Sequence, residues 1–270
     1  MFQYYILMKR YEEIDILKGI AVICMVVFHF FYFPNKYGFK EIEYNTDFLN
    51  TIARIAQFIF IGSVGVNLTL SKEKSDEKEE DKSEFIKKNI KRVVKLVFLA
   101  LLMSLFTYFI FGDKFVKFGI LHFISFASLA LFYFVDDLKI MYTLLILSIL
   151  VYYLIKNNPE VFRSIPEKIA FVSGFYNNKY QSVDHFPIFP WIIVVLIGVI
   201  VGHYIKKKKD IFPKNIKENV VVSSIGKIGA SSLEIYSVHW IVLYVIYCII
   251  YSKWVREKYI SSLVDPTVTP

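Results

Sequence analysis

The feature that most limits what this chain can fold into is a series of seven long apolar segments separated by polar stretches. Each segment approaches the ~20 residues that an α-helix needs to cross the hydrocarbon core of a bilayer. Their approximate bounds are 14–34, 49–71, 93–112, 118–135, 139–155, 187–205 and 228–250. The sequence therefore predicts an all-α, polytopic integral membrane helix bundle with about seven transmembrane helices.

Composition excludes the main alternative classes. Hydrophobic residues make up 56% of the chain, above the roughly 45–50% of a soluble domain. The two cysteines, Cys24 and Cys248, both lie inside apolar runs, so we expect neither a disulfide scaffold nor a metal site. The net charge of +8 comes from Lys and Arg that flank the apolar runs, which is typical of membrane topology signals and not of nucleic-acid binding. The predicted partner is membrane lipid, and no nucleic acid is expected.

The distribution of basic residues predicts the orientation in the membrane. With a cytoplasmic N-terminus, 20 of the 32 Lys and Arg fall at inner ends and 11 at outer ends, while Arg54 lies within a span. Cytoplasmic loops carry the excess of Lys and Arg, so this orientation is favoured, and seven spans leave the C-terminus outside. We expect one multi-pass domain over 1–270 in the cell membrane, with a charged cytoplasmic loop 72–92, an outer loop 156–186 and a basic cytoplasmic loop 206–227.

Polar residues inside the apolar segments are the first candidates for a functional site. An ionisable group within a span is costly, so it normally faces the protein interior and marks a functional path. The candidates are Asp15, Lys18, His29, Arg54, Gln57, His122, Glu234 and His239.

Lys18 and His29 are predicted to share one face of the first helix. They are eleven residues apart, which is about three turns and about 16 Å along the axis. Asp15 lies three residues before Lys18 and is placed to pair with it. A cation at the cytoplasmic mouth and an imidazole deeper in the membrane suit an elongated donor with an anionic end and a reactive end, and coenzyme A fits that description.

A second group of polar residues is expected in the outer half of the membrane. Arg54 and Gln57 lie near the outer start of the second span and His122 near that of the fourth, while Asp184 and His185 precede the sixth. An arginine within a span needs an anionic partner, and the candidates for Arg54 are Asp184, Glu234 or a donor phosphate.

The spacing of Gly62, Gly65, Gly198 and Gly202 is that of small residues at helix interfaces. This spacing more often indicates close packing between helices than the approach of a ligand. We assign these glycines no role in ligand binding.

Four ordered segments resemble a known family. Lys18 and His29, within EEIDILKGIAVICMVVFHFFYF, resemble the Arg/Lys-x10-His signature of the transmembrane acyltransferase superfamily. The closest likeness is to its prokaryotic branch related to heparan-alpha-glucosaminide N-acetyltransferase. Three further segments are similar in the same order, around His122, around Asp184 and Trp191, and around His239. The resemblance extends from residue 12 to about residue 245.

The resemblance implies a function and a set of site residues. It implies transfer of an acyl group, acetyl above all, from cytosolic acyl-CoA to a sugar or other polar acceptor at the outer face, without a metal. His29 corresponds to the family's catalytic histidine and would act as a base or as an acyl carrier. Lys18 replaces the more usual arginine, and Arg54 is a second candidate for donor binding. The possible lining residues are Asp15, Gln57, His122, Asp184, Trp191 and His239.

Two other functions remain open at this point. A transporter or flippase of a polar or lipid-linked solute would use the same buried charges without chemistry, although the chain has no internal repeat of the kind common in transporters. A non-catalytic membrane scaffold would explain the spans but not Arg54 or the shared face of Lys18 and His29. For His29 itself, the alternative is a neutral imidazole hydrogen-bonded to a neighbouring helix. The acceptor, the acyl length and the oligomeric state leave no mark in the sequence.

Overall fold

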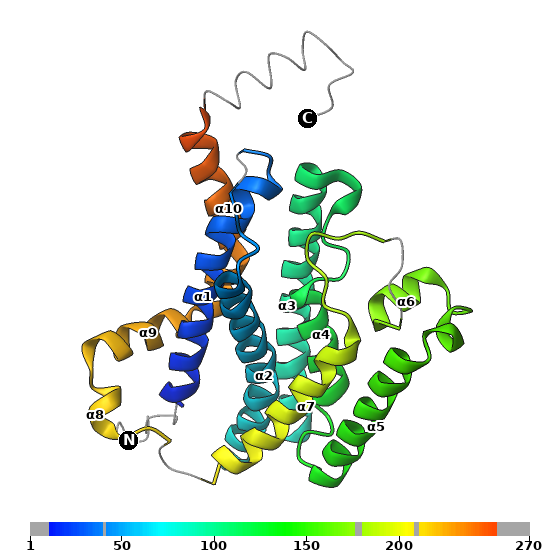
Figure 1. The fold of residues 1–270 in the computed structure, drawn as a ribbon. Coiled ribbons are helices and arrows are strands. Elements are labelled where there is room, and N and C mark those ends of the chain that lie inside the picture. The colour runs from blue at the N-terminus through cyan, green and yellow to red at the C-terminus, as the bar shows by residue number, and fades with distance from the viewer. Residues whose placement is uncertain (1–10, 40–41, 176–179, 208–210, 253–270) are drawn as a thin grey trace. The chain divides into compact units, whose positions relative to one another are not determined.

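The computed structural model describes residues 11–39, 42–175, 180–207 and 211–252. Within these residues every regular element is a helix (Figure 1), as predicted. Two parts of the topology prediction concern residues that the structure does not describe. They are the C-terminal end, predicted on the outer side of the membrane, and the basic residues Lys9 and Arg10. The helices of at least seven residues are α1 (Glu12–Lys36), α2 (Asp47–Glu77), α3 (Lys82–Phe111), α4 (Ile120–Leu131), α5 (Leu138–Asn157), α6 (Glu167–Ser173), α7 (Ile188–Ile205), α9 (Val220–Ala230) and α10 (Ser232–Ile250).

Six helices of the described residues are long and apolar enough to cross a membrane, namely α1, α2, α3, α5, α7 and α10. One of the seven predicted spans is shortened. The fourth predicted span, 118–135, is only the twelve-residue α4, about 18 Å long. It is short because residues before Ile120 are extended and pair with the chain before α7: the amide of Val183 donates to the Lys114 carbonyl, and that of Phe186 to the Phe118 carbonyl, both at 2.9 Å.

The chain forms two compact units, which are described separately. Unit 1 contains residues 58–214 together with Tyr11, and unit 2 contains residues 12–57 and those from 215 onward. The short α8 (Lys214–Lys217) lies at the junction. The expectation of one domain over 1–270 stays a prediction.

In unit 1, close approach between helices depends on glycine. A Cβ at Gly65 would lie 2.1 Å from the Val195 carbonyl oxygen, and one at Gly198 would lie 2.1 Å from the Gly62 carbonyl oxygen. The hydroxyl of Thr69 donates across the same interface to the Val199 carbonyl at 3.1 Å. The predicted packing role is therefore confirmed for Gly65 and Gly198, where α2 and α7 approach backbone to backbone, whereas a Cβ at Gly62 would meet only a side chain at 3.8 Å.

In unit 2, α1 packs against both α9 and α10 (Figure 1). A Cβ at Gly19 would lie 2.0 Å from the Ile225 carbonyl oxygen, and one at Gly229 would lie 1.7 Å from that of Asp15. Further along α1, the Tyr247 hydroxyl donates to the Phe30 carbonyl. Unit 2 is thus built around α1.

Two predicted loops are largely helical. The charged segment 72–92 is divided between the end of α2 and the start of α3, and only residues 78–81 connect them. The alternating charges of this segment favour a helix, because Lys72 pairs with Asp76 one turn later and such pairs stabilise helices. The basic segment 206–227 includes most of α9, whose first turn is capped by the Asn219 side chain. The segment 156–186, predicted as an outer loop, contains α6, which ends at Gly174 in the left-handed conformation (φ 80°).

Candidate functional site

The N-terminal half of α1 carries the predicted ion pair. Lys18 Nζ lies 2.7 Å from Asp15 Oδ1, and the two side chains are 15% and 10% exposed. The pairing predicted from their spacing is therefore confirmed. The same end of α1 is joined to α8, because Glu13 pairs with Lys217 at 3.3 Å.

The α1 face between Lys18 and His29 is filled with packed side chains. Val22 and Met25 occupy the two intervening positions and are only 2% and 5% exposed. This face is thus covered in the structure, since α1 is closely packed against α9 and α10, and its predicted role in donor binding stays a prediction. A long donor fits along it only if these helices separate.

At the other end of α1, His29 forms a pair with His239 of α10. His29 Nδ1 lies 3.2 Å from His239 Nε2, and His239 Nδ1 lies 2.6 Å from the Tyr236 carbonyl oxygen. A carbonyl accepts only, so His239 Nδ1 carries a proton and, in the neutral ring, its Nε2 is an acceptor. His29 Nδ1 is then the donor, and the lone pair of His29 Nε2 is the basic site left over. We call His29 and His239 the histidine pair.

An aromatic wall holds the histidine pair in place. The ring of His29 stacks on Phe33, with ring centroids 4.7 Å apart, and its centroid lies 5.5 Å from that of Trp240. Phe33 and Trp240 are 0% and 3% exposed, and His239 is 4% exposed, whereas His29 is half-buried. His239 is therefore a buried support, and the His29 residue as a whole is the less buried member of the pair.

Arg54 and Gln57 belong to the part of α2 in unit 2. Arg54 is exposed and Gln57 half-buried. Among the described residues, no ion pair or hydrogen bond of Arg54 occurs within unit 2, which also contains Glu234. Its predicted role in binding the donor stays a prediction.

His122, in unit 1, is held entirely by its own neighbourhood. The Gly119 amide donates to His122 Nδ1 at 3.3 Å, and His122 Nε2 lies 3.3 Å from Ser104 Oγ. Ser104 Oγ donates in turn to the Val116 carbonyl at 2.6 Å. Since Nδ1 accepts, Nε2 carries the proton and donates to Ser104. Both ring nitrogens of His122 are occupied.

Asp184 supports the same helix end. Its Oδ2 accepts from the Ile120 amide at 3.1 Å, at the N-terminus of α4. Burial raises the pKa of the Asp184 carboxyl to about 6, and the hydrogen bond from Ile120 partly offsets this. A Cβ at Gly119 would lie 2.2 Å from Asp184 Oδ2, so any larger residue there would displace the Asp184 carboxylate. We call Ser104, Gly119, His122 and Asp184 the capping network.

The remaining predicted residues of unit 1 are packed among aromatic rings. His185 Nε2 bonds the Phe171 carbonyl at 2.8 Å and its ring stacks on Phe171 at 3.9 Å. Trp191 lies against Phe58 and Phe186, with centroids 5.6 and 5.2 Å away. These contacts stabilise the loop before α7.

Sequence reasoning missed the residues that orient the candidate site. Tyr236, whose carbonyl fixes His239, and Phe33, which stacks on His29, each lie one turn from a histidine. Their spacing of three and four residues was the available signal. No cluster of three or more His, Cys, Asp or Glu side chains suited to a metal occurs within the residues that the structure describes.

Comparison with known proteins agrees with the resemblance seen in the sequence. The family profile described as "Heparan-alpha-glucosaminide N-acetyltransferase, catalytic" matches residues 10–241. The chain matches no curated protein and no solved structure. The matched range includes both units, the histidine pair and the capping network.

Proposed function

Because this chain belongs to the heparan-alpha-glucosaminide N-acetyltransferase catalytic family, we propose that it is a membrane acetyltransferase that uses acetyl-CoA and takes His29 as its general base. The observation that carries this proposal is the histidine pair. Its hydrogen bonds leave the basic lone pair on His29 Nε2. A histidine imidazole is the side chain that most often serves as a general base.

The proposed reaction moves one proton and one acetyl group. An acceptor hydroxyl or amine attacks the thioester carbonyl of acetyl-CoA while His29 Nε2 takes the acceptor's proton. The carbon–sulfur bond then breaks, and the imidazolium returns the proton to the departing thiolate, giving free coenzyme A and the acetylated acceptor. His239 is a positioning residue, because its Nε2 accepts the His29 Nδ1 proton and fixes the tautomer, as the orienting member of a catalytic triad does.

The donor's phosphates are assigned to Lys18, with Arg54 as the second candidate. Lys18 lies eleven residues before His29, about 16 Å along the helix axis. The packed positions Val22 and Met25 mean that donor binding separates α1 from its neighbours. The proposed setting is the cell membrane with the N-terminus in the cytoplasm, membrane lipid around the helices and a glycan or other polar acceptor outside.

The substitution His29→Ala tests the proposal. We expect acetyl transfer from radiolabelled acetyl-CoA to fall by about 10² to 10⁴-fold, the usual contribution of a general base, while acetyl-CoA still raises the melting temperature in detergent. Retention of full activity by a folded His29→Ala protein would overturn the assignment. Label attached to the wild-type protein without acceptor would instead identify His29 as an acyl carrier. Solute movement without consumption of acetyl-CoA would indicate a transporter.

A further inference from the structure

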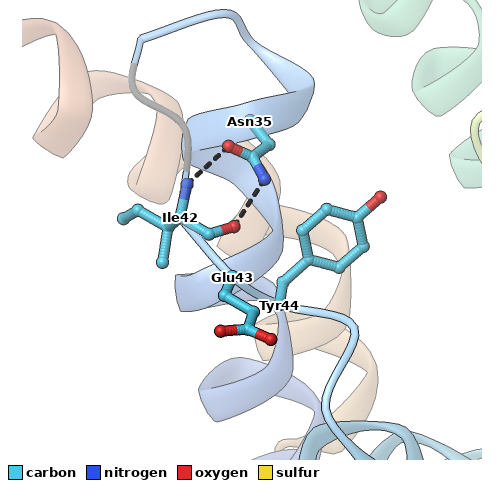
Figure 2. A pocket seen from close by; sticks show the side chains of 4 residues that line it. All are labelled: Asn35, Ile42, Glu43 and Tyr44. Carbon is cyan, nitrogen blue, oxygen red and sulfur yellow. Dashed lines mark hydrogen bonds between the residues drawn. The ribbon is translucent and has the colours of Figure 1, made fainter.

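Besides the histidine pair, two surfaces of the protein carry opposite charge. In unit 2, beyond His29 along α1, a hollow of about 470 Å³ is lined by Asn35, Ile42, Glu43 and Tyr44 (Figure 2). Asn35 shapes this hollow, because its Nδ2 donates to the Ile42 carbonyl at 2.6 Å and its Oδ1 accepts from the Ile42 amide at 2.7 Å. The charged residue of this lining is an acid, which repels anions. The second surface, at the start of α3 in unit 1, is basic.

The first four turns of α3 carry an excess of positive charge. Residues 82–95 contain six Lys and Arg side chains and a single acid, Glu84. Glu84 pairs with Lys88 at 3.8 Å, and Lys88 also pairs with Glu80. The helix therefore offers no further acid to neutralise its other basic residues.

Three of these basic residues have no partner in unit 1. Lys87 and Lys91 are exposed, and Arg92 is half-buried. Among the described residues of unit 1, none of the three takes part in an ion pair or a hydrogen bond. Arg92 lies one turn from the buried residues Asn89 and Leu96, so its side chain begins beside the packed face of α3. A guanidinium held there without a counter-ion is costly, and an anion from outside the chain would relieve that cost. We call Lys87, Lys91 and Arg92 the basic stripe.

The two lysines of the basic stripe lie in line with an exposed apolar face of the same helix. Phe98 follows Lys91 by seven residues, which is about two turns. Leu102 and Leu105 continue this face at helical spacing. Phe98, Leu102 and Leu105 are 59%, 45% and 54% exposed, on a helix long and apolar enough to cross a membrane. Positive charge is thus followed along α3 by surface suited to hydrocarbon.

The two halves of this surface match the two halves of an anionic phospholipid. Its phosphate is an anion that Arg binds through a planar fork and Lys binds as a point charge. Its acyl chains need exposed apolar surface directly below the headgroup. A soluble phosphate would use only the basic half. Basic clusters beside a transmembrane helix are typical of sites for anionic lipids.

We propose that the basic stripe binds the headgroup phosphate of an anionic phospholipid, whose acyl chains lie against Phe98 and Leu102 on the same helix. Arg92 supplies the forked contact, and Lys87 and Lys91 supply the surrounding positive charge. This inference goes beyond the proposed acetyltransferase function and does not depend on it.

The test measures binding to the full chain in a non-ionic detergent, as the rise in melting temperature with added lipid. Dioctanoyl phosphatidylglycerol is compared with dioctanoyl phosphatidylcholine, which has the same chains without net charge, and with inorganic phosphate, which has no chains. We expect a saturable rise with phosphatidylglycerol that weakens in high salt. If phosphatidylcholine stabilises the protein equally, the charge recognition is wrong. If inorganic phosphate does so, the site takes soluble anions and the lipid assignment is wrong.

A triple variant tests the position of the site. Lys87→Gln, Lys91→Gln and Arg92→Gln together should weaken phosphatidylglycerol binding by about 100-fold, since a basic residue near a membrane surface contributes about fivefold in affinity. Phe98→Ala should weaken both lipids, because both use the apolar face. Acetyl transfer provides no part of this readout.

A matched control removes the same three charges elsewhere in unit 1. Lys156→Gln, Arg163→Gln and Lys168→Gln lie at exposed positions and together should keep the wild-type affinity. An equal loss in this control, or wild-type affinity in the basic-stripe variant, would overturn the proposal. Should the basic-stripe variant not fold, Lys91→Gln alone, at an exposed position, should still weaken binding by about fivefold. An unchanged affinity in Lys91→Gln would then overturn it.

Discussion

The histidine pair of unit 2 and the capping network of unit 1 use the same side chain in opposite ways. His122 has both ring nitrogens occupied, one by the Gly119 amide and one by Ser104. His29 also donates from one nitrogen, but its partner is another imidazole, and the hydrogen bonds leave a basic lone pair on the other nitrogen. A histidine in an apolar helix can therefore be judged as a candidate base only when the hydrogen-bond partners of both its ring nitrogens are known.

Substitution of His239 is expected to have the largest effect on acetyl transfer and therefore sharpens this comparison most. Replacing it by alanine removes the imidazole that faces His29 Nδ1, so the orientation and tautomer of His29 are less constrained. We expect kcat to fall by about 10 to 100-fold, the usual effect of losing an orienting partner, and the pH profile of kcat/KM to move. His239→Gln, whose amide oxygen still accepts a proton, should recover part of the loss. An unchanged pH profile in His239→Ala would mean that His239 only packs.

The next effect concerns the glycine at the start of α4. Gly119→Ala places a Cβ 2.2 Å from Asp184 Oδ2, so the carboxylate must leave the helix end. Overpacking of this kind costs about 1 to 3 kcal/mol, and we expect the melting temperature in detergent to fall accordingly. Gly62→Ala is a suitable control, because its Cβ would meet only a side chain at 3.8 Å. Gly112→Ala is not suitable, because that glycine has a positive φ (53°).

A smaller effect is expected for His122. Replacing it by alanine leaves the Gly119 amide and Ser104 Oγ without their partner, which costs about 1 to 2 kcal/mol of stability. Acetyl transfer per folded molecule should stay within a few fold of wild type, in contrast to His29→Ala. A loss of activity as large as that of His29→Ala, at unchanged stability, would place His122 in the catalytic machinery.

The smallest effect concerns the pH dependence due to Asp184. Burial raises its folded pKa to about 6, so the folded protein binds this proton more tightly than the unfolded chain does. The resulting stability is full below the unfolded pKa of about 3.9 and is lost as the pH rises through about 6. Asp184→Asn keeps an acceptor for the Ile120 amide and should flatten the melting temperature between pH 4 and 6. A slope equal to that of wild type would assign the dependence to other groups.

Much of the helical framework was predictable because hydropathy acts locally. A run of about 20 apolar residues has to satisfy its backbone within itself in a bilayer, and a helix does so. The errors occurred where other residues compete for the backbone. Residues 115–118 are extended because a segment more than sixty residues away supplies their hydrogen bonds, and α9 forms within a basic segment because glycines allow it to contact α1.

The sequence by itself determined the membrane class, the family, the Asp15–Lys18 pair and the candidacy of each histidine, because these depend on composition and on spacing within one helix. Only the tertiary structure decided which histidines meet, that Val22 and Met25 fill the face below His29, and that Asn35 shapes a hollow beyond it. The reason is that hydrogen-bond partners from other helices decide which nitrogen keeps its lone pair, and helical periodicity carries no information about them.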